Sequence, residues 1–135
     1  MSDRPEKKLY EVIQADGRYP PDAFAFLQVG LARAVQEVYG DSAEAEEEED
    51  QPHHVSGRQL CNALRDEGKD RWGMLARTVL NRWNIHETLD FGKMVYLLVE
   101  NDLMHKTEQD SVEDFRDVFG FDEAFGAEEI FELQE

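Results

Sequence analysis

Few side chains in this sequence could do chemistry, and they are scattered along the chain. His53 and His54 follow an acidic run that ends at Asp50, and imidazoles together with carboxylates can bind a divalent metal. Adjacent side chains in an extended segment point apart, however, and no helical i, i+4 pair of ligands accompanies them. Dense like charges usually stay solvated, so the pattern favours a solvated segment over a metal site. His86 and His105 are too isolated to indicate a site.

Two residues could act as nucleophiles, but each fits a structural role better. Cys61 is the only cysteine, which excludes an intramolecular disulfide, and its place beside Leu60 and Leu64 predicts a buried core thiol. Ser56 and Gln59 have the spacing of a capping box at a helix start. No glycine-rich phosphate loop and no Gly-x-Ser-x-Gly motif occurs in the sequence. The sequence therefore indicates no catalytic residue, no cofactor and no metal, and we do not expect an enzyme.

The charge of the chain is strongly negative but unevenly distributed. The net charge of the 135 residues is −17, which disfavours DNA, RNA and anionic lipid because binding to phosphates depends on lysine and arginine. Residues 58–93 hold seven bases against five acids, whereas residues 100–135 hold thirteen acids and two bases. An anionic partner is therefore conceivable only in the middle of the chain. No stretch has the apolar length of a membrane helix and the first residues do not read as a signal peptide, so we expect a cytoplasmic protein with no membrane partner.

Apolar periodicity predicts a mainly α-helical fold with about five helices. Prolines, glycines and capping residues mark the ends of the expected helices, which cover residues 6–15, 21–39, 56–67, 70–83 and 89–101. Trp72 and Trp83 share the apolar arc of the helix 70–83 and are expected in the core. The opposite arc forms a candidate basic face of Arg71, Arg77 and Arg82.

The signal changes after residue 101. Residues 103–107 and 115–119 are short segments with apolar residues, separated by turn-forming residues, and they predict a C-terminal β-hairpin. The alternative is that Ser111, followed by Asp114, caps a short helix. Three helices followed by a hairpin also have the approximate order of a winged-helix-like, α+β arrangement in residues 55–120.

The whole chain, residues 1–135, is expected to fold as a single domain. Residues 41–50 carry seven acids and no base, so we expect an acidic flexible loop over 41–52. Residues 121–135 read as an acidic tail with scattered aromatic residues. Its candidate interaction residues are Phe121, Phe125 and Phe131. The alternative is that this tail packs back on the body.

Four sets of segments together resemble an uncharacterised bacterial protein family that is described as restricted to the Verrucomicrobia–Planctomycetes group. They are His-Val-Ser-Gly at 54–57, Asp-Phe-Gly at 90–92, the residues 106–111 with 113–115, and Phe-Asp-Glu-Ala-Phe at 121–125. The resemblance covers most of the chain, and the acidic run 41–50 looks like an insertion. The family has unknown function, so the resemblance implies relatives and no catalytic residue.

These features favour a non-catalytic, acidic protein-interaction module whose partner is another protein. The alternative is a winged-helix-like transcriptional or nucleic-acid-associated regulator, which the basic face favours and the total charge disfavours. An enzyme with an unrecognised site is the third hypothesis, because a fold does not exclude a site grafted on it.

Duplex DNA separates the first two hypotheses. We expect no measurable binding at physiological salt, because phosphate binding needs a contiguous cationic surface and the candidate basic face is small. Fluorescence anisotropy with mixed-sequence duplex DNA over a salt series measures this binding. Micromolar binding that weakens with salt, and is lost in an Arg71/Arg77/Arg82 triple alanine variant, would put the regulator first.

Overall fold

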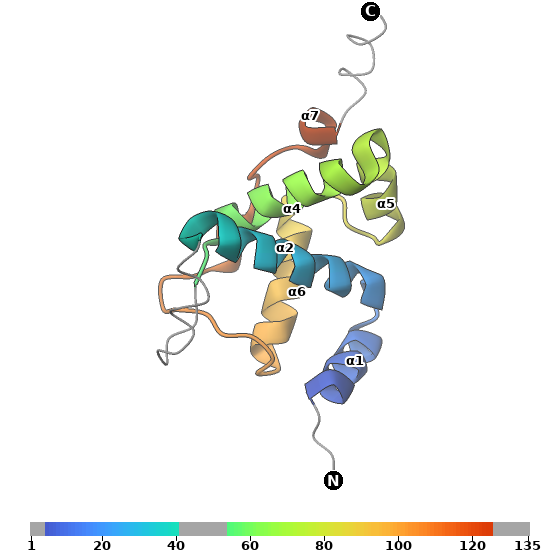
Figure 1. Cartoon of the computed structure of the whole chain (residues 1–135). Helices are drawn as coiled ribbons and strands as arrows, with labels where there is room; N and C mark the ends of the chain where they lie inside the picture. Colours follow the sequence, from blue (N-terminus) through green and yellow to red (C-terminus); the bar gives the residue numbers. More distant parts are fainter. Residues whose placement is uncertain (1–4, 41–53, 126–135) are drawn as a thin grey trace, which may run out of the picture.

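A computed structural model describes residues 5–40 and 54–125, which form a helical body (Figure 1). The expected acidic loop 41–52 lies outside the described residues, as does Phe131. The elements are α1 (Pro5–Asp16), α2 (Pro21–Tyr39), α4 (Gly57–Trp72), the 3-10 turn η2 (Gly73–Leu75), α5 (Ala76–Arg82), α6 (Thr88–Glu100), the 3-10 turn η3 (Val112–Phe115) and α7 (Phe121–Phe125). The mainly helical fold is thus confirmed. None of the described helices combines the length and the apolar content needed to cross a membrane.

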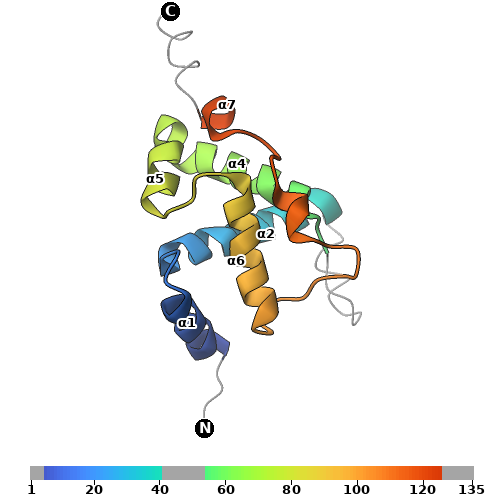
Figure 2. The same cartoon turned by 180° about the vertical axis from the view of Figure 1, so that it is seen from behind.

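Three helices enclose most of the core. α2 and α4 lie side by side (Figure 1), and α6 crosses them, as Figure 2 shows from the opposite side. Gly30 allows the close approach of α2 to α4, because a Cβ at that position would overlap the Leu64 side chain. The largest fully buried side chains come from these helices and their neighbours and include Phe24, Phe26, Leu27, Leu64, Leu80, Phe91, Met94 and Leu98.

A buried polar contact joins the turn after α1 to the start of α6. Tyr19 Oη donates a hydrogen bond of 2.7 Å to Asp90 Oδ1, and Asp90 Oδ2 accepts from the backbone N–H groups of His86 and Glu87. Burial and the hydrogen bond to Asp90 raise the pKa of Tyr19 above its ordinary value. Because Asp90 is buried, these donors compensate for the water that its carboxylate has lost.

The break between the third and fourth helices differs from the prediction. The helix that was expected to end near Gly68 continues to Trp72, and the chain breaks at Gly73, which has a left-handed φ of 53°. A glycine inside a helix costs only about 1 kcal/mol, and Gly68 is buried in α4, so packing of this turn outweighs the cost. Gly73 ends the helix because glycine adopts the left-handed conformation at little cost.

The two tryptophans lie at the edge of the core rather than inside it. Trp72 and Trp83 pack against Phe26, with ring centroids 5.0 and 5.8 Å away, and their own rings are 5.5 Å apart at a near-perpendicular angle. Both tryptophans are half-buried. The shared arc therefore predicted their contact with the core, while full burial was not found.

The prediction of a C-terminal β-hairpin is wrong, since residues 54–125 of the structure contain no strand. Asp102 adopts a left-handed φ of 60° after α6, and residues 103–111 follow as an irregular loop. Ser111 Oγ then accepts from Glu113 N while Asp114 Oδ2 accepts from Ser111 N, which starts η3. The short capped helix, weighed as the alternative, is what forms. A winged-helix arrangement is excluded with the hairpin, because its wing is missing from the described residues.

The beginning of the expected acidic tail packs back on the body. Phe121 and Phe125 of α7 are buried, and their rings lie 5.5 Å apart. Figure 1 shows α7 beside α5 and the end of α4. These two residues therefore belong to the core and not to an exposed interaction surface.

Phe115 fixes the C-terminal loop to the helical body. Its ring lies where a Cβ at Gly57 or at Gly92 would come within 2.9 Å and 2.8 Å of it, respectively. Thr88 Oγ1 donates to Phe115 O at 2.6 Å and accepts from Val118 N at 3.1 Å. The start of α4, the first half of α6 and η3 are thus held together at one point.

Two helix-interior glycines should respond to alanine with opposite signs. Gly92→Ala should cost about 1–3 kcal/mol of unfolding free energy, because the new methyl group overpacks against Phe115. Gly68→Ala should gain about 0.5–1 kcal/mol, because its Cβ would meet neighbours only at 3.7 Å and beyond, while alanine favours the helix. Urea denaturation measures both values, and a shift of equal sign at the two positions would contradict this packing.

Candidate functional site

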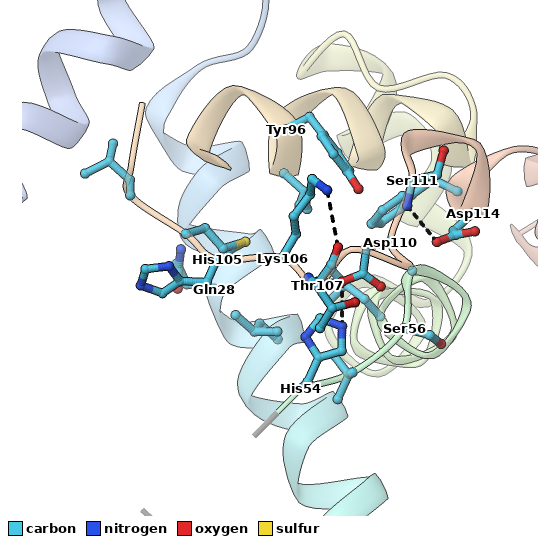
Figure 3. Close-up of a pocket in the computed structure, with 18 residues that line it drawn as sticks. Gln28, His54, Ser56, Tyr96, His105, Lys106, Thr107, Asp110, Ser111 and Asp114 are labelled. Atoms are coloured by element: carbon cyan, nitrogen blue, oxygen red, sulfur yellow. Dashed lines mark hydrogen bonds and ion pairs between the residues drawn. The ribbon is translucent and has the colours of Figure 1, made fainter. Parts of the chain in front are cut away.

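The described residues enclose a hollow of about 510 Å³ where α2, α4, α6 and the loop after α6 meet (Figure 3). Gln28 and Leu31 come from α2, and Val95 and Tyr96 come from α6. The start of α4 and the residues before it add 54–57 and Leu60. The loop and η3 complete the wall with 103–107, Asp110, Ser111, Asp114 and Phe115. The Phe115 contact anchors the end of this loop against α4 and α6.

The lining of the hollow is mainly apolar. Leu60, Val95 and Phe115 are buried core residues, while Leu31 and Leu103 are half-buried and pack against that core. An apolar surface that stays accessible inside a hollow gains free energy when a ligand removes it from water. The geometry therefore suits an apolar group as the anchor of a ligand.

His54 lies at this hollow, although the sequence predicted a solvated residue. Its Nε2 atom is 2.7 Å from Asp110 Oδ2, a distance typical of an ion pair, while the alignment is not that of a hydrogen bond. Tyr39 Oη donates a hydrogen bond of 2.6 Å to the His54 carbonyl and fixes the backbone there. Fifty-six positions separate the two partners in the sequence, so no local spacing could have revealed the pair.

The loop carboxylates are organised by the backbone around them. Asp110 Oδ2 accepts from Thr107 N at 2.8 Å, and Lys106 Nζ donates to Thr107 O at 3.2 Å. Burial raises the pKa of Asp110, but the hydrogen bond from the Thr107 amide and the contact with His54 outweigh it, and the pKa lies below its ordinary value. Asp110 therefore stays ionised at neutral pH and holds a negative charge at the rim.

Tyr96 contributes the most unusual polar group of the site. Its hydroxyl is buried and makes no hydrogen bond with any residue that the structure describes. Figure 3 shows the ring projecting from α6 toward the loop that carries Lys106 and Asp110. Burial raises the pKa of Tyr96, and the carboxylates of Asp110 and Asp114 raise it further, so the hydroxyl stays protonated at neutral pH.

The arrangement suits binding better than covalent chemistry. The hydroxyls of Ser56 and Ser111 cap helix starts, and neither is hydrogen-bonded to the His54 ring within the described part of the chain. Cys61 is fully buried as predicted, and burial raises the pKa of its thiol to about 12, which leaves it protonated and inert. Within residues 5–40 and 54–125, no group of three or more His, Cys, Asp or Glu side chains could hold a metal ion.

The candidate basic face does not form one cationic surface. Arg71 is at the end of α4, where it pairs with Glu67 at 2.7 Å and its guanidinium lies over the rings of Phe26 and Trp72. Arg77 lies on α5 and pairs with Asp122. Arg82 is exposed at the end of α5. The break at Gly73 separates the three arginines onto two helices, and acids neutralise two of them.

Replacement of Tyr19 and of Tyr96 by phenylalanine distinguishes a hydroxyl that stabilises the fold from one that does not. Tyr19→Phe should cost about 1–3 kcal/mol of unfolding free energy, because the buried Asp90 loses a donor. Tyr96→Phe should leave the unfolding free energy unchanged or raise it by up to about 1 kcal/mol, because its hydroxyl has no partner to lose. Urea denaturation measures both variants. A loss at Tyr96 as large as that at Tyr19 would mean that the Tyr96 hydroxyl is already satisfied in the folded chain.

Comparison with known proteins adds no relative: no protein-family model, curated protein or solved structure matches the chain. The resemblance to the Verrucomicrobia–Planctomycetes family stays a prediction from its motifs. Two of the four sets of motif segments nevertheless contribute to the hollow, and a third contacts one of its lining residues. Residues 54–57 line it together with Lys106, Thr107, Asp110, Ser111, Asp114 and Phe115, and Gly92 lies against Phe115.

Proposed function

We propose that this chain is a non-catalytic protein-interaction module that binds a segment of its partner in the hollow. The observation that carries the proposal is the buried, unpartnered hydroxyl of Tyr96 above an apolar lining. Buried polar groups in folded proteins are almost always hydrogen-bonded. A ligand that displaces the atoms covering this hydroxyl, supplies the missing partner and fills the apolar space would satisfy both features at once.

The dimensions of the hollow support recognition of a few side chains. Sites for small ligands and for anchor residues have volumes of roughly 300–1,000 Å³ and combine an apolar lining with few polar groups. The hollow of about 510 Å³ has this composition. In protein interfaces, one or two buried anchors supply most of the affinity, so a hollow of this size is sufficient for a specific contact.

The charge of the body supports a protein partner over nucleic acid. Arginines across the surface pair with neighbouring carboxylates: Arg18 with Asp16, Arg33 with Glu37, Glu67 and Asp70, Arg65 with Asp66, and Arg116 with Glu113. Arginines that are already neutralised release no counterions from a phosphate backbone. The proposed partner is therefore another protein.

We place this module in the cytoplasm, and the buried free thiol of Cys61 supports a reducing compartment. We also propose membership of the family that the four sets of motif segments resemble. Both proposals are independent of the binding site, and neither changes how the hollow would act.

A tryptophan at the mouth of the hollow tests the proposed function. Gln28 is an exposed residue of α2 that lines the hollow, so Gln28→Trp should fill the opening without disturbing the core. Gln36→Trp puts the same side chain on an exposed position of the same helix away from the hollow. Peptides are first selected with the wild-type chain from a random library displayed on phage. Their affinities for the three proteins are then measured by calorimetry.

We expect Gln28→Trp to weaken binding of the selected peptides by about tenfold or more, which corresponds to about 1.4 kcal/mol. Gln36→Trp should leave the affinity unchanged. Equal melting temperatures of the two variants show that both are folded. A library that yields no binder, or binders that are equally sensitive to both substitutions, would refute a binding site in the hollow.

A further inference from the structure

We infer that the hollow recognises a peptide segment in which an apolar side chain stands beside a lysine or an arginine. The inference rests on the proposed function and adds the chemistry of the partner. It depends on three features of the site: the apolar lining, the carboxylates around the Tyr96 hydroxyl, and the lysine of the chain itself that lies at the rim.

The apolar side chain of the partner packs against the hydrocarbon lining of the hollow. Leu31, Val95 and Leu103 present hydrocarbon surface from two helices and the loop, and Phe115 adds an aromatic ring. Burial of a leucine-sized side chain against such a surface is favourable, because it removes apolar area from water. This contribution supplies affinity but does not select one apolar residue over another.

The charged residue of the partner is selected by the field at the Tyr96 hydroxyl. Asp110 and Asp114 both lie close enough to act on this hydroxyl electrostatically. Asp114 uses Oδ2 to accept from Ser111 N, and its Oδ1 atom makes no hydrogen bond with a described residue. A cationic N–H group of the partner can donate to this oxygen, whereas a carboxylate would be repelled.

Lys106 shows that the rim of the hollow accommodates a cation. Its side chain lines the hollow, and its ammonium group donates to Thr107 O (Figure 3). The lysine is exposed and bonded to only one described acceptor, so a cation from a partner can displace it into solvent. Displacement costs affinity, because the lysine repels an arriving cation until it moves.

The net charge of the chain acts in the same direction. At −17, the chain attracts cationic segments over long range and repels acidic ones. Screening at physiological ionic strength limits this attraction to about 8 Å, so it raises the rate of encounter while the hollow provides the specificity.

The library selection distinguishes failure of this inference from failure of the proposed function. We expect the peptides that Gln28→Trp weakens to share a lysine or arginine next to an apolar residue. Peptides that bind in the hollow but carry acidic or only neutral residues there would overturn the cationic partner and leave the interaction module standing. A selection without binders would overturn both.

Three charge variants then test the geometry with synthetic peptides from the selection. Asp114→Asn keeps an acceptor for Ser111 N but removes the charge, and it should weaken binding by about fivefold. Glu108→Gln is the matched control, because it removes one negative charge from an exposed position of the same loop outside the lining. It should change the affinity less than about twofold.

Lys106→Met gives opposite results for the two signs of ligand charge. A cationic peptide should bind more tightly, by about twofold to fivefold, once the competing ammonium group is gone. An anionic ligand would instead bind Lys106→Met more weakly, because this substitution removes the only lysine or arginine of the loop. Weaker binding to Lys106→Met, or equal effects of Asp114→Asn and Glu108→Gln, would contradict the proposed recognition.

Discussion

The packing of the Phe115 side chain against Gly57 and Gly92 is the constraint on which the rest of the site depends. Gly57 begins α4 and Gly92 lies in α6, so a ring that touches both backbones fixes how the two helices meet. The hydroxyl of Thr88 then donates to the Phe115 carbonyl and accepts from the Val118 amide. Interiors are close-packed, and a methyl group at either glycine would have to displace the ring. The Phe115 contact anchors the far end of the loop of residues 103–111, while the ion pair of Asp110 with His54 and the hydrogen bond from Leu103 N to Leu98 O hold its other parts.

Most surface arginines of the described body are neutralised by ion pairs with neighbouring carboxylates. Arg33 alone contacts Glu37, Glu67 and Asp70, which ties α2 to α4 at the surface. Exposed pairs of this kind contribute little to stability, typically below about 1 kcal/mol each. Their larger effect is on recognition, because they neutralise arginines of the described body, while loop carboxylates such as Asp114 remain to act on a ligand. The position of the remaining carboxylates therefore matters for recognition as well as the net charge of the chain.

Local signals predicted the helices well and the loop poorly. Pro21 and Gly40 bound α2, and Ser56 with Gln59 forms the capping box that the spacing indicated. Apolar residues within 103–107 and 115–119 suggested strands, but in this fold they face a wall made by helices distant in sequence. Phe115 in particular packs against Gly57 and Gly92 of two helices. Its segment therefore contacts helices and does not pair with a second strand in the part of the chain that the structure describes. No periodicity within a short window encodes such a contact, so the hairpin was predicted wrongly.

The hollow could not be predicted from the sequence for the same reason. Tyr96 is the clearest example. On the helix that contains it, tyrosine and phenylalanine would be read alike as partly buried aromatic residues. Only the assembled structure shows that the hydroxyl is buried without a described partner, beside two carboxylates. An unsatisfied buried hydroxyl costs about 1–3 kcal/mol, which a phenylalanine would avoid. A fold optimised only for stability would avoid this cost, whereas a ligand that displaces the atoms covering the hydroxyl can supply the missing hydrogen bond. The cost in stability is thus the physical argument for binding at this site.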